Sequence, residues 1–234
     1  MESVIAFFER IDPVWAALIA TTLTWLATAL GASLVFFFKQ INRTLFDALL
    51  GFTGGVMLAA SFWSLLLPAF SMSEGAGWSK ISPIVIGFVL GALFLFVLDQ
   101  LLPHLHVNFK ESEKEGLKTP WQRSTLLFLA ITLHNIPEGL AVGVMFGGIA
   151  MGVPDATIGG AVALTIGIMV QNFPEGLAVA MPMRRLGYSR MKSFMFGQFS
   201  AAVEPVFGVI GVLTVAAIAP ILPYALSFAA GAMI

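Results

Sequence analysis

The 234-residue sequence contains no cysteine, only three histidines and few charged residues. Without cysteine, it can form neither a disulfide nor a thiolate metal site. Charged residues make up 11% of the chain, and a formal net charge of -1 offers no basic surface for nucleic acid. Hydrophobic residues make up 58%, more than an ordinary soluble domain carries. These proportions indicate a membrane protein.

Long apolar runs account for this composition. A membrane helix needs about 20 residues to cross a hydrocarbon core of ~30 Å. The alternation typical of a membrane barrel is missing, so we predict an all-α, polytopic membrane helix bundle forming one transmembrane domain over residues 1–234. The predicted helices are 14–38, 48–70, 84–102, 124–149, 157–181, 194–219 and 221–234. The last run would rise only about 21 Å, so we expect this helix to be cut short.

Positive charge is concentrated on alternate connections between these runs. The opposite side of the protein holds only Arg10 and Lys80. The other ten lysines and arginines lie within 39–43, 110–123 and 184–192. Because cytoplasmic loops are enriched in Lys and Arg, we expect these three connections to be cytoplasmic and the N-terminus to lie outside.

One connection, residues 103–120, is longer than the others. Its mixed charges and few apolar residues predict a solvated cytoplasmic loop. His104 and His106 in this loop are either transient metal ligands or ordinary solvated side chains, and their spacing does not decide between the two.

Two apolar runs carry the same polar insertion, with the copies starting 37 residues apart. A carboxylate is costly to place in lipid, so two copies indicate a site. Residues three and four apart share a helix face, so His134 and Asn135 are expected beside Glu138. Glutamine replaces histidine in the second copy. The copies read His134-Asn135-Ile136-Pro137-Glu138-Gly139 and Gln171-Asn172-Phe173-Pro174-Glu175-Gly176.

Each acid has a proline before it and a glycine after it. The prolines lack an N–H, so the carbonyls of Leu133 and Val170 lose their usual partners and need protein, water or a cation instead. The glycines allow a neighbouring helix or a solvated ion to approach closely. A third acid, Glu204, precedes Pro205 near the middle of the sixth run.

The two motif-bearing runs are consecutive and therefore antiparallel, which makes the repeated motif an inverted pair in space. Inverted repeats with broken helices that meet near the bilayer midplane are typical of secondary transporters. Three acids at one depth repel one another, and a divalent ion neutralises two charges. One imidazole among carboxylates and amides favours Zn²⁺, Fe²⁺ or Mn²⁺. The structural alternative is a pair of proline kinks with hydrogen-bonded glutamic acids.

The paired motifs, with Glu204-Pro205 on the sixth run, resemble the ZIP (Zrt/Irt-like protein) family of metal transporters, nearest its prokaryotic GufA-like branch. Residues 55–61 and 226–234 extend the likeness over essentially the whole chain. The resemblance implies an eight-helix fold of which about seven helices are present here. It also implies a multi-pass protein of the prokaryotic plasma (cell inner) membrane, homodimers, and movement of divalent cations toward the cytoplasm through a binuclear site between the fourth and fifth helices.

The same resemblance implies two metal positions. Glu138 and Glu175 would bridge these two positions. The chain departs from many family members at two ligands: Gln171 stands where they have histidine, and Asn172 stands where an acid can occur. The first position would use His134, Glu138, Gln171 and Glu175, with Met57 from the second helix. The second would use Asn135, Glu138, Asn172, Glu175 and Glu204.

We therefore predict a transporter of divalent transition-metal cations, with Zn²⁺ first and Fe²⁺, Mn²⁺ or Cd²⁺ as alternatives, and no organic cofactor. The metal ion and the lipid bilayer are its expected partners. The rival hypothesis is an intramembrane metalloenzyme, which disagrees with the single buried histidine and the missing His-Glu-x-x-His motif. A non-transporting scaffold would instead tolerate glutamine at both Glu138 and Glu175.

Overall fold

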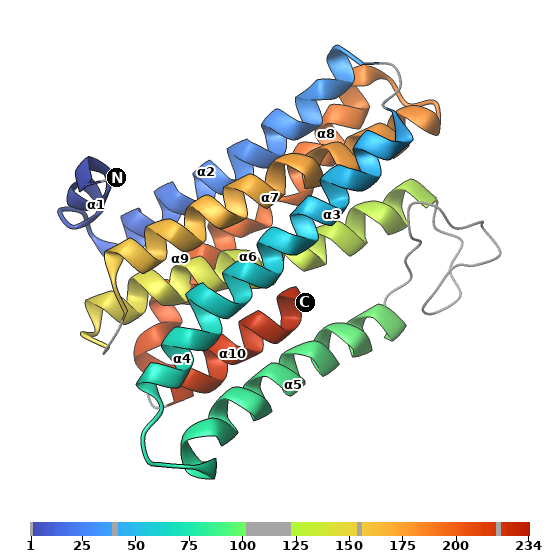
Figure 1. Cartoon of the computed structure of the whole chain (residues 1–234). Coiled ribbons are helices and arrows are strands. Elements are labelled where there is room, and N and C mark those ends of the chain that lie inside the picture. Colours follow the sequence, from blue (N-terminus) through green and yellow to red (C-terminus); the bar gives the residue numbers. More distant parts are fainter. Residues whose placement is uncertain (1, 39–41, 102–122, 154–155, 219–220) are drawn as a thin grey trace.

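The structure, a computed structural model, describes residues 2–38, 42–101, 123–153, 156–218 and 221–234 (Figure 1). These residues form helices and no strand, and six segments are long and apolar enough to cross a membrane. The predicted all-α polytopic bundle is confirmed. The helices are α1 (Glu2–Phe8), α2 (Pro13–Ser33), η1 (Leu34–Phe36), α3 (Arg43–Ala60), η2 (Ser61–Leu66), α4 (Leu67–Met72), α5 (Trp78–Leu101), α6 (Arg123–Ala150), α7 (Ile158–Arg185), α8 (Arg190–Ser200), α9 (Val203–Ile218) and α10 (Leu222–Met233).

The ends of several helices differ from the sequence expectation. A short helix, α1, precedes the first crossing, and α2 begins where the Asp12 side chain accepts a hydrogen bond from the Val14 amide at 2.9 Å. The second crossing contains a π-helical turn, η2, that ends two residues before Pro68. Pro68 has no N–H and so removes one backbone donor from the regular helix. The predicted loop 103–120, with His104 and His106, lies outside the described residues.

The sixth crossing is broken, where we expected one helix over 194–219. Helix α8 ends at Ser200, a turn occupies residues 201–202, and α9 starts at Val203. Pro205 is the physical reason, because it has no N–H for the Ala201 carbonyl and its ring disfavours a continuous helix there. In the first turn of α9 the missing N–H costs little. The break places Glu204 at the start of a helix.

Helices α6 and α7 lie side by side near the centre of the bundle and run in opposite directions (Figure 1). Helix α9 packs on α6, α2 packs on α7, and α10 packs on α5. Both helices continue through the prolines of their motifs. Buried apolar side chains fill the space between the motifs and the α6–α7 connection, among them Val142, Phe146, Leu164 and Ile168.

The glycines of the two motifs serve equivalent helix contacts. A Cβ atom added to Gly139 would lie 2.8 Å from the Glu204 Cα on α9. A Cβ atom added to Gly176 would collide with the Thr28 carbonyl and lie 3.0 Å from the Ala32 amide on α2. Backbone cannot yield as a flexible side chain can, so each glycine is what allows a neighbouring helix to approach its acid.

Candidate metal centre

Three side chains from the two motifs gather between α6 and α7. The ligand atoms of His134, Glu138 and Glu175 all lie within 4.8 Å of one another, and we call these three residues the central cluster. His134 Nε2 lies 3.8 Å from Glu138 Oε1 on the same face of α6. Both acids are buried, and His134 is half-buried. The four-residue spacing thus produces the predicted convergence of imidazole and carboxylate.

Gln171 occupies the position in α7 that His134 has in α6. Its Nε2 donates a hydrogen bond across the interface to Glu138 Oε1. A carboxylate only accepts hydrogen bonds, so the amide nitrogen must face it, and the amide oxygen of Gln171 remains unpartnered. The two halves of the site therefore differ, because one presents an imidazole and the other an amide oxygen.

The broken sixth crossing is held by side chains from α2 and α6. At the break, Ala202 N bonds to Phe199 O and Glu204 N bonds to Ala201 O, so the carbonyls of Gln198 and Ser200 lose their helical partners. Trp25 Nε1 donates to the Gln198 carbonyl at 2.8 Å. Asn135 Nδ2 donates to the Ser200 carbonyl at 3.0 Å. Buried carbonyls need such replacements, so these two side chains stabilise the break.

Glu204 is held in place by α2 and α7. Its Oε2 accepts a hydrogen bond from the Thr24 hydroxyl, and its Oε1 accepts one from Asn172 Nδ2 at 2.8 Å. Among the described residues, Glu204 does not belong to the central cluster, although it is fully buried beside it. The third acid is therefore near the cluster but engaged elsewhere.

Five buried side-chain oxygens of the predicted ligands have no hydrogen-bond donor among the residues that the structure describes: Asn135 Oδ1, Glu138 Oε2, Gln171 Oε1, Asn172 Oδ1 and Glu175 Oε2. Buried polar atoms without partners are rare, and each one calls for an explanation. All five are acceptors, so a cation satisfies them and an anion does not. With the His134 imidazole they form an oxygen-rich donor set with one nitrogen, which suits borderline divalent metals.

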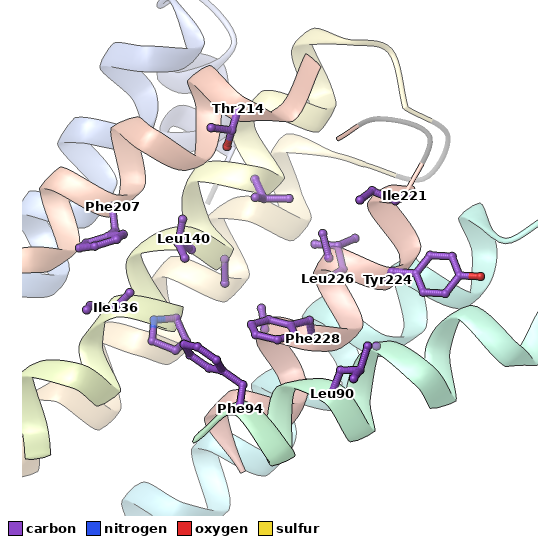
Figure 2. Close-up of a pocket in the computed structure, with 16 residues that line it drawn as sticks. Leu90, Phe94, Ile136, Leu140, Phe207, Thr214, Ile221, Tyr224, Leu226 and Phe228 are labelled. Carbon is purple, nitrogen blue, oxygen red and sulfur yellow. The ribbon is translucent and has the colours of Figure 1, made fainter. Parts of the chain in front are cut away.

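A cavity on another face of α6 has a different character from the central cluster. It measures about 510 Å³ and is bounded by α5, α6, α9 and α10. Figure 2 shows that its labelled walls are almost entirely apolar: Leu90, Phe94, Ile136, Leu140, Phe207, Thr214, Ile221, Tyr224, Leu226 and Phe228. None of the described residues that line it is charged, so it offers a cation no carboxylate ligand.

Residues 110–234 match the family described as “ZIP Zinc transporter”. The chain belongs to the ZIP family. It is 41% identical to zinc transporter ZIP11 of Homo sapiens over 94% of this chain and 86% of that protein. It is 39% identical to zinc transporter GufA of Myxococcus xanthus over 94% of this chain and 84% of that protein. The ZIP resemblance inferred from the paired motifs, including its GufA-like branch, is confirmed.

In this ZIP protein, the predicted ligands fall into two connected groups. His134, Glu138, Glu175 and Gln171 meet between α6 and α7, whereas Asn172 and Glu204 pair beside them. The Asn135 amide nitrogen donates a hydrogen bond to the Ser200 carbonyl at the end of α8. Met57 is half-buried on α3, which packs against α7, and its role as a ligand stays a prediction.

Sequence reasoning missed Thr24, Trp25 and Gln198, which lie on α2 and α8 and hold Glu204 and the helix break beside the candidate site. Thr24 is one of three fully buried threonines on α2, with Thr21 and Thr28. Their spacing of three and four residues places them on one face of an apolar helix. That polar stripe was the available signal that α2 faces the site.

Proposed function

We propose that this chain moves divalent transition-metal cations, zinc first, across the membrane through the site between α6 and α7. The observation that carries the proposal is the set of five unpartnered buried oxygens around the central cluster. Ligand oxygens within a membrane helix bundle, without donors to satisfy them, are suited to a positive ion that passes through. The metal is therefore the substrate, and the two motifs are its binding residues.

The names of the relatives support this substrate. ZIP11, GufA and the other similar proteins are named zinc transporters. Membership of a transporter family, with an ion site at membrane depth, favours transport over the metalloenzyme alternative. In the proposed arrangement, His134, Glu138, Gln171 and Glu175 form the first metal position. Asn135, Asn172 and Glu204 extend it to a second, with the two motif acids shared.

Charge at the ends of the helices supports an orientation. The start of α3, the end of α7 and the start of α8 lie at one end of the bundle, and α1 lies at the other (Figure 1). Arg43, Arg184, Arg185 and Lys192 belong to the first set of helix ends, and Arg10 follows α1. By the enrichment of cations on the cytoplasmic side, the N-terminus lies outside. Movement of the ion toward the cytoplasm is what the ZIP resemblance implies. We place the protein in a prokaryotic plasma membrane, surrounded by lipid and as a homodimer, as the GufA-like resemblance implies.

The test is uptake of Zn²⁺, Fe²⁺, Mn²⁺ and Cd²⁺ into proteoliposomes that contain the purified protein. Zinc flux should fall at least roughly tenfold in His134→Ala and Glu175→Gln, because each removes a ligand that must carry its lone pair or charge to the metal. Glu74→Gln is the matched control, since Glu74 is an exposed acid outside the site. Unchanged zinc flux in both site variants would refute the site. Absence of flux for every metal in the wild-type protein would refute transport.

A further inference from the structure

The three buried acids of the site are not equivalent. Glu138 and Glu175 each keep one oxygen without a donor and belong to the central cluster. Glu204 differs, because both of its oxygens accept hydrogen bonds, from Thr24 on α2 and from Asn172 on α7. Hydrogen bonds to a charged group are among the stronger ones in proteins. The hydrogen bonds within the described residues thus satisfy both oxygens of Glu204 but leave one oxygen of each of the other two acids without a donor.

Both donors to Glu204 have a second acceptor on α2. The Thr24 hydroxyl lies 2.8 Å from the Thr21 carbonyl oxygen, and a hydroxyl has one proton to give to either acceptor. Asn172 Nδ2 lies 3.3 Å from the Thr24 carbonyl oxygen. If the Glu204 carboxylate moves away, both donors still have a hydrogen-bond acceptor. The free-energy cost of leaving a buried donor without a partner is therefore largely avoided.

We propose that Thr24 and Asn172 form a latch that keeps Glu204 out of the central cluster until the first metal ion is bound, and then releases it to form the second metal position. Thr24 is a positioning residue, because it acts on Glu204 and not on the metal. This inference rests on the proposed function, since it concerns the order in which the ligands of that site are used.

The latch predicts how the Thr24 hydrogen bond and the first metal ion each affect binding of the second ion. The hydrogen bond from Thr24 stabilises Glu204 only while the second position is empty, so it opposes binding of the second ion. A bound first ion supplies the opposing pull, because a divalent charge attracts the nearby carboxylate more strongly than a neutral hydroxyl does. Asn172 is suited both to holding Glu204 and to binding the second ion. Its Oδ1 has no hydrogen-bond partner among the described residues, and its Nδ2 can still donate to the Thr24 carbonyl after Glu204 moves.

The test is a zinc-binding isotherm of the purified full chain in lipid nanodiscs, with Zn²⁺ as the only added metal. Thr24→Val keeps the side-chain shape and removes the donor. It should lower the dissociation constant of the second zinc step roughly tenfold, the factor expected for one hydrogen bond to a charged group. The first step should not change. Thr24→Ser keeps a hydroxyl donor, so its zinc-binding isotherm should match that of the wild type.

Thr21→Val is the matched control, because Thr21 is equally buried on the same helix and its hydroxyl donates within α2, to the Ala17 carbonyl at 2.6 Å. In a Glu204→Gln background, Thr24→Val should have no further effect. An unchanged or weakened second step in Thr24→Val overturns the latch, as does an equal change in Thr21→Val or a single zinc step in the wild type. Zinc uptake by the wild-type protein is the separate test of transport.

Discussion

Replacing Glu138 by glutamine should have opposite effects on the stability of the metal-free protein and on zinc binding. Glu138 is fully buried, and its ligand oxygen lies within 4.8 Å of that of Glu175. At an effective dielectric constant of about 20, two ionised carboxylates at that distance repel by about 3.5 kcal/mol. A proton on either acid removes the repulsion, so Glu138→Gln gains about this amount only where both acids are ionised.

The same substitution removes a charged ligand shared by both proposed metal positions. Removing a residue that only hydrogen-bonds to a metal ligand weakens metal binding about 10- to 100-fold. Removing a ligand itself should therefore weaken binding at least about 100-fold. At zinc concentrations well above the wild-type dissociation constant, a 100-fold weaker site loses about 2.7 kcal/mol of zinc-dependent stabilisation. A variant that is more stable without metal should therefore respond less to metal.

Thermal unfolding of the detergent-solubilised protein, with a chelator and then with Zn²⁺, measures both effects. We expect Glu138→Gln to raise the midpoint in chelator and to lose most of the zinc-induced increase. Glu74→Gln, at an exposed acid, should leave both values unchanged. A lower midpoint in chelator would show that Glu138 does not repel its neighbours. A full zinc response would show that it does not bind the metal.

Two further substitutions test the packing that holds the site. Gly176→Ala should lower the unfolding midpoint and zinc uptake, because its Cβ would collide with the Thr28 carbonyl, whereas Gly51→Ala meets no atom within 4 Å and should be tolerated. Trp25→Phe should lower the free energy of chemical unfolding by about 1–3 kcal/mol, because the Gln198 carbonyl in the last turn of α8 loses its donor. Trp63→Phe, at an exposed indole, should leave it unchanged. Equal effects within either pair would contradict the packing argument.

Much of the central cluster could be predicted from the sequence because its geometry is local. The spacing of His134 and Glu138 fixes their shared helix face, and the short α6–α7 connection brings the second motif alongside. Polar residues in lipid are few and costly, so those present stood out against the apolar background.

The parts that could not be predicted depend on contacts between distant helices. Hydropathy treats residues 194–219 as one apolar run. It does not register that Pro205 interrupts the helix, or that Trp25 and Asn135 donate hydrogen bonds to the carbonyls that the break leaves without helical partners. Thr24 was missed for a similar reason. A threonine in an apolar helix commonly bonds to its own backbone, and only the packing of α2 against α9 brings its hydroxyl to Glu204.

The break between α8 and α9 also gives Glu204 a different electrostatic setting from the other two acids. It stands in the first turn of α9, where aligned peptide dipoles favour a negative charge. Glu138 and Glu175 stand in the middle of long helices, where no helix end compensates their charge. Glu204 is thus the acid that the protein itself can balance, and the two mid-helix acids are the pair that depends on an incoming cation.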